Sequence, residues 1–261
     1  MTPDWMAGLQ ACGDRPPDVP RATLWTSSPH AHIGSIDTDL AHRIAAAGLP
    51  LTRIGQGWKV GAPLDPSLEQ VARWLSTNLL NGRWRDELLA VTDEAGQVLG
   101  AIERAAVRPL GIATHAVHLV GHTEDGAVWV QQRALDKAVD PGLWDTTMGG
   151  LTSADESVAE TLERETWEEA GLRIGQLQGV REFGRITVRR PVAEGYLVEH
   201  IHCFEALLPQ GLAPANQDGE VMRFEAVGAD ALDAWLEAER FTVEAALVLL
   251  RWKDGRRKTR R

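Results

Sequence analysis

The sequence predicts an α/β fold preceded by a small α+β unit. From residue 111 onward, short apolar runs bounded by turn residues alternate with amphipathic segments, as strands and helices do in layered α/β proteins. Two apolar segments, 116–122 and 127–131, flank an Asp-Gly turn and predict a hairpin. In this half of the chain we also expect a strand at 198–208 and helices at 229–238 and 242–252.

Two further parts precede this half, and one follows it. Residues 1–21 contain four prolines among polar residues, which favours an extended or loosely attached arm. Residues 22–110 predict an accessory α+β domain, followed by the main domain at 111–255. The basic tail, 256–261, is expected to be disordered, with contact to an acidic partner as the alternative. The elements expected in the accessory domain are helices at 38–47 and 67–80 and strands at 58–60, 88–92 and 98–103.

Composition limits the classes of function. The net charge of −10 argues against general nucleic-acid binding, which depends on clustered Lys and Arg. Small anionic ligands remain compatible with this charge, because a metal ion or a few local cations can offset it. Cys12 and Cys203 lie far apart without metal-ligand spacing, so we expect free thiols. No apolar run approaches the roughly 20 residues that cross a membrane, and no signal peptide is evident, so a cytoplasmic location is expected.

The segment from Gly149 to Leu172 is the most informative. It contains neither Gly nor Pro between residues 157 and 170, and apolar or small residues recur there every three or four positions, which predicts a helix. Gly171 then provides a natural end for this helix. The residues expected to face the core are Ala159, Leu162, Thr166 and Ala170.

Three carboxylates share one face of this predicted helix. Glu165, Glu168 and Glu169 stand at i, i+3 and i+4, so they project together and repel one another. A hard divalent cation with oxygen ligands turns that repulsion into attraction. The cluster therefore indicates an Mg²⁺ site, with Mn²⁺ as a substitute, against the alternative of a solvated acidic helix face.

The residues before the helix fit such a site. Gly149 and Gly150 lack a side chain, so the backbone can approach a ligand closely, and a carbonyl at Gly149 is a candidate metal ligand. We also expect an ion pair between Glu156 and Arg164 that ties the loop to the helix. In this interpretation Arg164 points away from the three carboxylates.

The spacing G-x5-E-x7-R-E-x2-E-E-x-G, from Gly150 through Gly171, resembles the complete Nudix box. The resemblance implies an α/β/α sandwich with a mixed sheet. It also implies that Glu165, Glu168 and Glu169 bind Mg²⁺, which bridges diphosphate oxygens and orients an attacking water. The sequence departs from the usual pattern at Thr166, where an aliphatic residue is common, and at Asp155, where many members have glycine. From these departures we expect only a local change of loop conformation.

Weaker similarity extends over residues 22–252. The segments 132–137 and 140–150 resemble one Nudix subgroup and make Arg133 and Lys137 candidate phosphate contacts. Motifs on both sides resemble Nudix proteins associated with thiamine pyrophosphokinase. That resemblance implies hydrolysis of thiamine diphosphate, and preferentially of its oxidised analogues, to the monophosphate, with an aromatic pocket stacking the heterocycle. No single tryptophan is assigned to that pocket.

Glu220 lies in an Asp-Gly-Glu segment that we consider a source of a fourth carboxylate near the metal. The proton acceptor for the attacking water is then a glutamate of the cluster, Glu165 or Glu168, or Glu220. His115 and His118 are expected to be ordinary core or surface histidines rather than substrate contacts.

Several alternatives stay open. An enzyme of the same fold acting on ADP-ribose or another nucleoside diphosphate derivative fits the same motif. A Nudix isopentenyl-diphosphate isomerase needs a cysteine near the double glycine, where this chain has Met148. A non-catalytic ligand sensor would be expected to have a degraded glutamate cluster. The partner expected is a small-molecule diphosphate, with neither nucleic acid nor membrane, and the fold is compatible with a homodimer.

Overall fold

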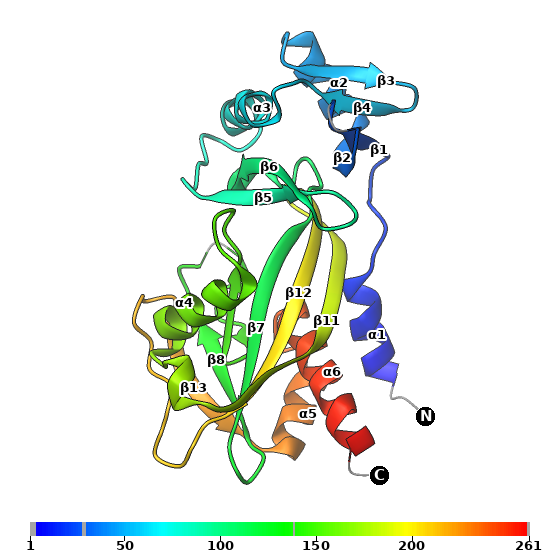
Figure 1. Cartoon of the computed structure of the whole chain (residues 1–261). Coiled ribbons are helices and arrows are strands. Elements are labelled where there is room, and N and C mark those ends of the chain that lie inside the picture. Colours follow the sequence, from blue (N-terminus) through cyan, green and yellow to red (C-terminus); the bar gives the residue numbers. More distant parts are fainter. Residues whose placement is uncertain (1–3, 28–29, 138, 260–261) are drawn as a thin grey trace.

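The computed structural model describes residues 4–27, 30–137 and 139–259. The molecule is elongated, with a smaller N-terminal region at one end and a larger sheet covered by helices at the other (Figure 1). This arrangement confirms the predicted α/β fold and the α+β region in front of it.

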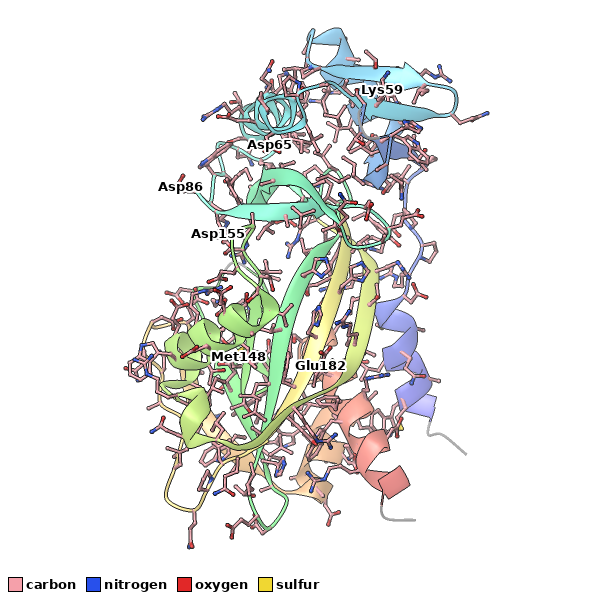
Figure 2. All side chains as sticks on the ribbon, in the orientation of Figure 1. Lys59, Asp65, Asp86, Met148, Asp155 and Glu182 are labelled. Atoms are coloured by element: carbon pink, nitrogen blue, oxygen red, sulfur yellow. The ribbon has the colours of Figure 1, made fainter. Side chains whose placement is uncertain are left out.

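The N-terminal region contains a four-stranded sheet and a two-stranded sheet. The first has the order β2-β1-β4-β3, and the second pairs β5 with β6. Both sheets contribute to one hydrophobic core that runs from Leu24 to Ile112. Asp65 on α3 accepts a hydrogen bond of 3.0 Å from the Ala101 amide and so ties the helix to β6 (Figure 2). The elements are β1 Arg21–Trp25, β2 His32–Asp37, α2 Thr38–Ala46, β3 Leu51–Ile54, β4 Gly57–Val60, α3 Leu64–Asn78, β5 Leu88–Thr92, β6 Val98–Glu103 and the short η1 Arg104–Ala106.

The larger sheet has seven strands and is mixed. Its main order is β11-β12-β7-β8-β13, while β10 pairs with β7 and β9 pairs with β8. Only the β12–β7 pair is parallel; the other pairs in this sheet are antiparallel. The elements are β7 Thr114–His122, β8 Val128–Arg133, β9 Trp144–Asp145, β10 Met148–Leu151, α4 Val158–Ala170, η2 Ile174–Gln176, β11 Gln178–Val192, β12 Gly195–Leu207, β13 Val221–Val227, α5 Ala229–Glu237 and α6 Val243–Thr259.

Helices cover both faces of this sheet, as the resemblance implies. Alternate residues of β7 point to opposite faces, so Val117 and Leu119 pack in the α4 core while Ala116 and Val120 pack in the α6 core. The side chains of α6 that fill the second core are fully buried. The result is a three-layer α/β/α sandwich (Figure 1).

Both chain ends differ from expectation. The prediction of an extended N-terminal arm is wrong for residues 4–13, which form α1 Asp4–Gly13, and Met6 on this helix is buried in the α6 core. The prediction of a disordered tail from residue 256 is also wrong, because α6 continues to Thr259 and Arg256 stacks over Trp252. For α1, the burial of Met6 in the α6 core outweighs the polar composition of the segment. Residues 1–3 and 260–261 lie outside the described part of the chain.

Two smaller predictions can be compared directly. Cys12 and Cys203 are free thiols, the first exposed and the second buried, as expected. None of the helices within the described residues is long and apolar enough to span a membrane.

The packing of α1 leads to a stability prediction. Met6 is only 6% exposed, so Met6→Ala should lower the free energy of unfolding by about 2 kcal/mol through lost burial. Gln10→Ala, an exposed change on the same helix, should stay within about 0.5 kcal/mol of the parent. Urea unfolding measures both, and an unchanged midpoint for Met6→Ala would mean that α1 is not docked.

Candidate active site

Helix α4 is fixed at both ends, which sets the direction of its carboxylates. Ser157 caps the N-terminus, and its side chain and that of Glu160 form a reciprocal capping box. Gly171 ends the helix with a φ of 63°, a left-handed conformation that glycine adopts without strain. Of the predicted core positions, Leu162, Thr166 and Ala170 are buried, whereas Ala159 is exposed. The apolar stripe therefore begins at Val158, which packs against the same core, rather than at Ala159.

Gly149 directs its backbone toward the carboxylates. Directly after β10, the Thr152 amide donates to the His115 carbonyl of β7. Alternate residues of an antiparallel strand bond to the same neighbour, so Gly149 faces away from β7. Its amide donates a 3.0 Å hydrogen bond to Oε2 of Glu169. Because the N–H and C=O of one strand residue point to the same side, the Gly149 carbonyl also faces this cluster.

Gly150 leaves the space that Glu165 occupies. A Cβ built on Gly150 would lie 2.0 Å from Cδ of Glu165, far inside van der Waals contact. Only glycine at this position lets the Glu165 carboxylate lie against β10. Met148, at the start of β10, and Asp155, in the loop between β10 and α4, are labelled in Figure 2.

One of the three carboxylates is buried, and a second, Glu165, is partly buried. Glu169 is 3% exposed and accepts hydrogen bonds from Gln131 and Gly149, yet burial and the nearby charge of Glu165 raise the pKa of its carboxyl to about 8. Burial also raises the pKa of Glu165, although Arg164 opposes that shift. Ionising these two carboxyls is therefore unfavourable in the protein alone, and a bound cation would stabilise their charged forms.

Arg164 has two sets of partners rather than one. It donates to Glu156 at 2.6 and 2.8 Å, and this contact holds the pKa of Glu156 below its usual range. Its Nη1 also donates to Glu165 at 2.8 Å and to Glu168 at 3.0 Å. The expected tie between loop and helix is present, but the expectation that Arg164 points away from the carboxylate cluster is wrong. The arginine side chain is long enough for its guanidinium to reach Glu156 in the loop as well as the carboxylates on α4.

The predicted phosphate contacts line the same cavity as the carboxylates of α4, and both already have acidic partners. Lys137 pairs with Glu220, so two residues assigned separate roles from the sequence are in direct contact. Arg133 lies 3.4 Å from Asp145 and donates to the Val139 carbonyl at 3.1 Å. These contacts hold both cations at the rim of the same cavity.

The residues present fit a divalent cation. The donor set consists of carboxylate oxygens and a carbonyl, the oxygen ligands that Mg²⁺ takes, and the buried charge of Glu169 has no cation paired with it among the described residues. Within residues 4–27, 30–137 and 139–259, no group of three or more Asp, Glu, His or Cys side chains is already arranged to bind one metal ion. The Arg164 guanidinium, which bonds Glu165 and Glu168 together, explains that arrangement.

A cavity of about 440 Å³ opens beside the cluster and reaches the N-terminal region. Ala154, in the loop before α4, donates to the Leu88 carbonyl of β5, which joins the two parts here. Among the described residues that line the cavity, His118 carries the only aromatic ring, so the expected aromatic pocket is not found there. Lining residues that the sequence did not single out for the site include Arg85, Glu87, Arg104 and Arg108 from the N-terminal region and Arg190, Glu199 and Glu244 from the main domain.

The two histidines in question have ordinary surroundings. His118 is buried, its Nδ1 lies 2.9 Å from Oγ1 of Thr146, and burial lowers its pKa. His115 packs beside His200 and His202, and burial lowers its pKa to about 4. Both stay neutral at pH 7, so neither supplies a positive charge to an anionic ligand.

The space at Gly150 leads to a binding prediction. Gly150→Ala should push Glu165 out of place and weaken Mg²⁺ binding by about tenfold or more, as the loss of a positioning contact does in metal sites. Gly175→Ala is the matched control, because a Cβ there meets open space. Calorimetric titration with Mg²⁺ compares the two, and equal affinities would show that Glu165 does not depend on the glycine.

Glu199 leads to a prediction about pH. Burial and the neighbouring Glu244 raise the pKa of Glu199 to about 7 from an ordinary value of 4.5. The folded protein therefore keeps a proton that the unfolded chain loses, so this group's contribution to stability falls as pH rises from 4.5 through 7. Between pH 5 and 8, Glu199→Gln should gain about 2 kcal/mol of unfolding free energy relative to the parent. Urea unfolding without metal at both pH values checks this, and a pH-independent difference would contradict it.

The sequence that builds this site is similar to a known domain family and to several known proteins. The NUDIX domain model matches residues 112–249, more than half of the chain. An uncharacterised Nudix hydrolase of Pseudomonas aeruginosa is 38% identical over 105 residues, covering 40% of this chain and 60% of the relative. The chloroplastic Nudix hydrolase 24 of Arabidopsis thaliana is 32% identical over 130 residues, covering 49% of this chain and 36% of the relative. This chain therefore spans about a third to three fifths of these two relatives.

Two further matches cover more of the matched protein. The isopentenyl-diphosphate Delta-isomerase of Streptomyces avermitilis is 33% identical over 141 residues, covering 53% of this chain and 70% of the relative. A crystal structure of a Deinococcus radiodurans protein aligns with 62% of this chain and 97% of its own, at 21% identity and a TM-score of 0.49. Because the family model covers more than half of the sequence and includes the whole carboxylate cluster, the chain belongs to the Nudix domain family.

Proposed function

We propose that this protein hydrolyses a diphosphate bond with the help of Mg²⁺ or Mn²⁺. One observation carries the proposal: Glu165, Glu168 and Glu169 lie together on α4, with Glu169 buried and the other two partly buried, at the edge of a cavity that basic residues also line. The family membership and the relatives named as Nudix hydrolases support it.

The cation would be held by Glu165, Glu168, Glu169 and the Gly149 carbonyl. When bound, it supplies charge that neutralises diphosphate oxygens and favours attack by water. Glu169 needs this charge most, because burial opposes its ionisation. In the proposed site Glu156 anchors Arg164, so the guanidinium stays near the cluster if Glu165 and Glu168 change partner.

The remaining steps belong to residues of the chain. Arg133 and Lys137 would bind the phosphate oxygens from the opposite wall of the cavity. Glu165, Glu168 and Glu220 are the candidate proton acceptors for the attacking water, which displaces a phosphate group as the P–O–P bond breaks. The pairing of Lys137 with Glu220 means that a phosphate held by Lys137 would release Glu220 for that task.

For the substrate we propose thiamine diphosphate or its oxidised analogues, which give the monophosphate. This proposal depends on the resemblance to the thiamine pyrophosphokinase-associated subgroup. The described lining has no Trp, Tyr or Phe, so the heterocycle would be bound by hydrogen bonds rather than by stacking. ADP-ribose or another nucleoside diphosphate derivative is the alternative substrate. Its base would likewise be bound by hydrogen bonds rather than by stacking.

Two other functions find less support. An isomerase acting like the Streptomyces relative needs a cysteine at the site, and neither Cys12 nor Cys203 lines the cavity. A non-catalytic sensor would not need all three carboxylates, which are present and grouped on α4.

Glu168 gives the direct test of the proposal. Glu168→Gln keeps the shape of the side chain but removes its charge, so Mg²⁺-dependent release of phosphate should fall by at least about 100-fold while the fold is retained. Glu163→Gln, an exposed change on the same helix, should keep the parent rate. Parent-like turnover in Glu168→Gln, measured under the same conditions, would exclude the proposed role of the cluster.

A further inference from the structure

The cavity has a second end, set apart from the carboxylate cluster. Gly149 of β10 pairs with His118 of β7. Glu199 of β12 pairs with Thr114, which lies four residues before His118 on β7. At about 3.3 Å per residue, the two pairs are about 13 Å apart along the strand. Ala116, Leu151 and Leu197 also line the cavity. A ligand bound at the carboxylates therefore has room to extend toward Glu199.

Glu199 is the one carboxylate at this end without a cationic partner among the described residues. Arg190 pairs with Glu244 at 3.1 Å, and Arg108 lies 3.4 Å from Glu194. The hydrogen bond to Glu199 comes from the Thr114 hydroxyl, at 3.2 Å from Oε2. The neighbouring arginines are thus committed elsewhere, and the remaining carboxylate oxygen of Glu199 is available to a ligand in the cavity.

We propose that Glu199 determines substrate specificity by accepting hydrogen bonds from N–H groups on the organic part of the substrate. The substrate class is a diphosphate ester whose organic group carries a basic nitrogen or an N–H-bearing heterocycle. This inference rests on the proposed function, because it places the diphosphate at Glu165, Glu168 and Glu169.

The surroundings of Glu199 favour such a ligand. Burial and the charge of Glu244 raise the pKa of its carboxyl to about 7, because Arg108, Arg190 and the Thr114 hydroxyl compensate the ionised form only in part. A ligand N–H group or positive charge would supply that compensation. A hydrocarbon group would leave the carboxyl unpaired in the occupied cavity, and sites built for hydrogen bonding reject such analogues strongly.

Two probes that share the diphosphate test this inference. Thiamine diphosphate carries an aminopyrimidine, whereas isopentenyl diphosphate carries only a hydrocarbon. We expect the parent protein with Mg²⁺ to favour thiamine diphosphate in KM and in calorimetric Kd. Glu199→Gln should weaken both constants for thiamine diphosphate by about tenfold to a hundredfold while changing kcat less than threefold. The constants for isopentenyl diphosphate should not change.

The matched control is Glu225→Gln, an exposed carboxylate change on β13 outside the cavity, which should retain the parent preference. Equal binding of the two probes by the parent, or a preference that survives Glu199→Gln, overturns the inference. If neither probe is hydrolysed but the calorimetric preference exists and disappears in Glu199→Gln, the specificity role of Glu199 holds and the proposed hydrolysis is wrong. The two failures are therefore distinguishable.

Discussion

The site depends on the crowding of negative charge on one face of α4. Glu165 lies against β10 in the space that Gly150 leaves, and the buried Glu169 accepts a hydrogen bond from the Gly149 amide. Arg164 is the basic residue that bonds directly to this cluster in the described chain, and it reaches only Glu165 and Glu168. Glu169 has no such partner, so burial raises its pKa to about 8 and its carboxyl stays largely protonated at neutral pH until a cation compensates the ionised form. A cluster whose ionised carboxylates lack enough neighbouring positive charge is suited to bind a divalent cation and the anionic ligand that the cation attracts.

The N-terminal region is part of the same surface. The loop before α4 bonds to β5, and Arg85, Arg104 and Arg108 line the cavity next to the cluster. These residues precede the segment that the family model matches. The family segment therefore contains the carboxylates that define the chemistry, while the far wall of the cavity comes partly from outside it.

The sequence predicted features that follow from local patterns. The 157–170 helix, its end at Gly171 and the β5–β6 hairpin were all predicted, because periodicity and glycine positions specify them. The strands β1, β2 and β11 were missed because their polar and apolar residues do not alternate strictly, although β1 pairs with β2 and β11 with β12, the next strand in the chain. The position of Arg164 was wrong because sequence spacing cannot show which rotamer a long side chain adopts. Glu199 was not assigned to the site, because its place in the cavity depends on the parallel pairing of β12 with β7.

The central claim is that this cluster supports metal-dependent cleavage of a diphosphate. The most direct measurement is phosphate-product release with and without Mg²⁺ from oxothiamine diphosphate, thiamine diphosphate and ADP-ribose at equal low concentrations. The account predicts Mg²⁺-dependent release of a monophosphate, fastest from the thiamine compounds. Faster release from ADP-ribose would contradict the thiamine proposal alone, and no Mg²⁺-dependent cleavage of any of the three would contradict the account of the site.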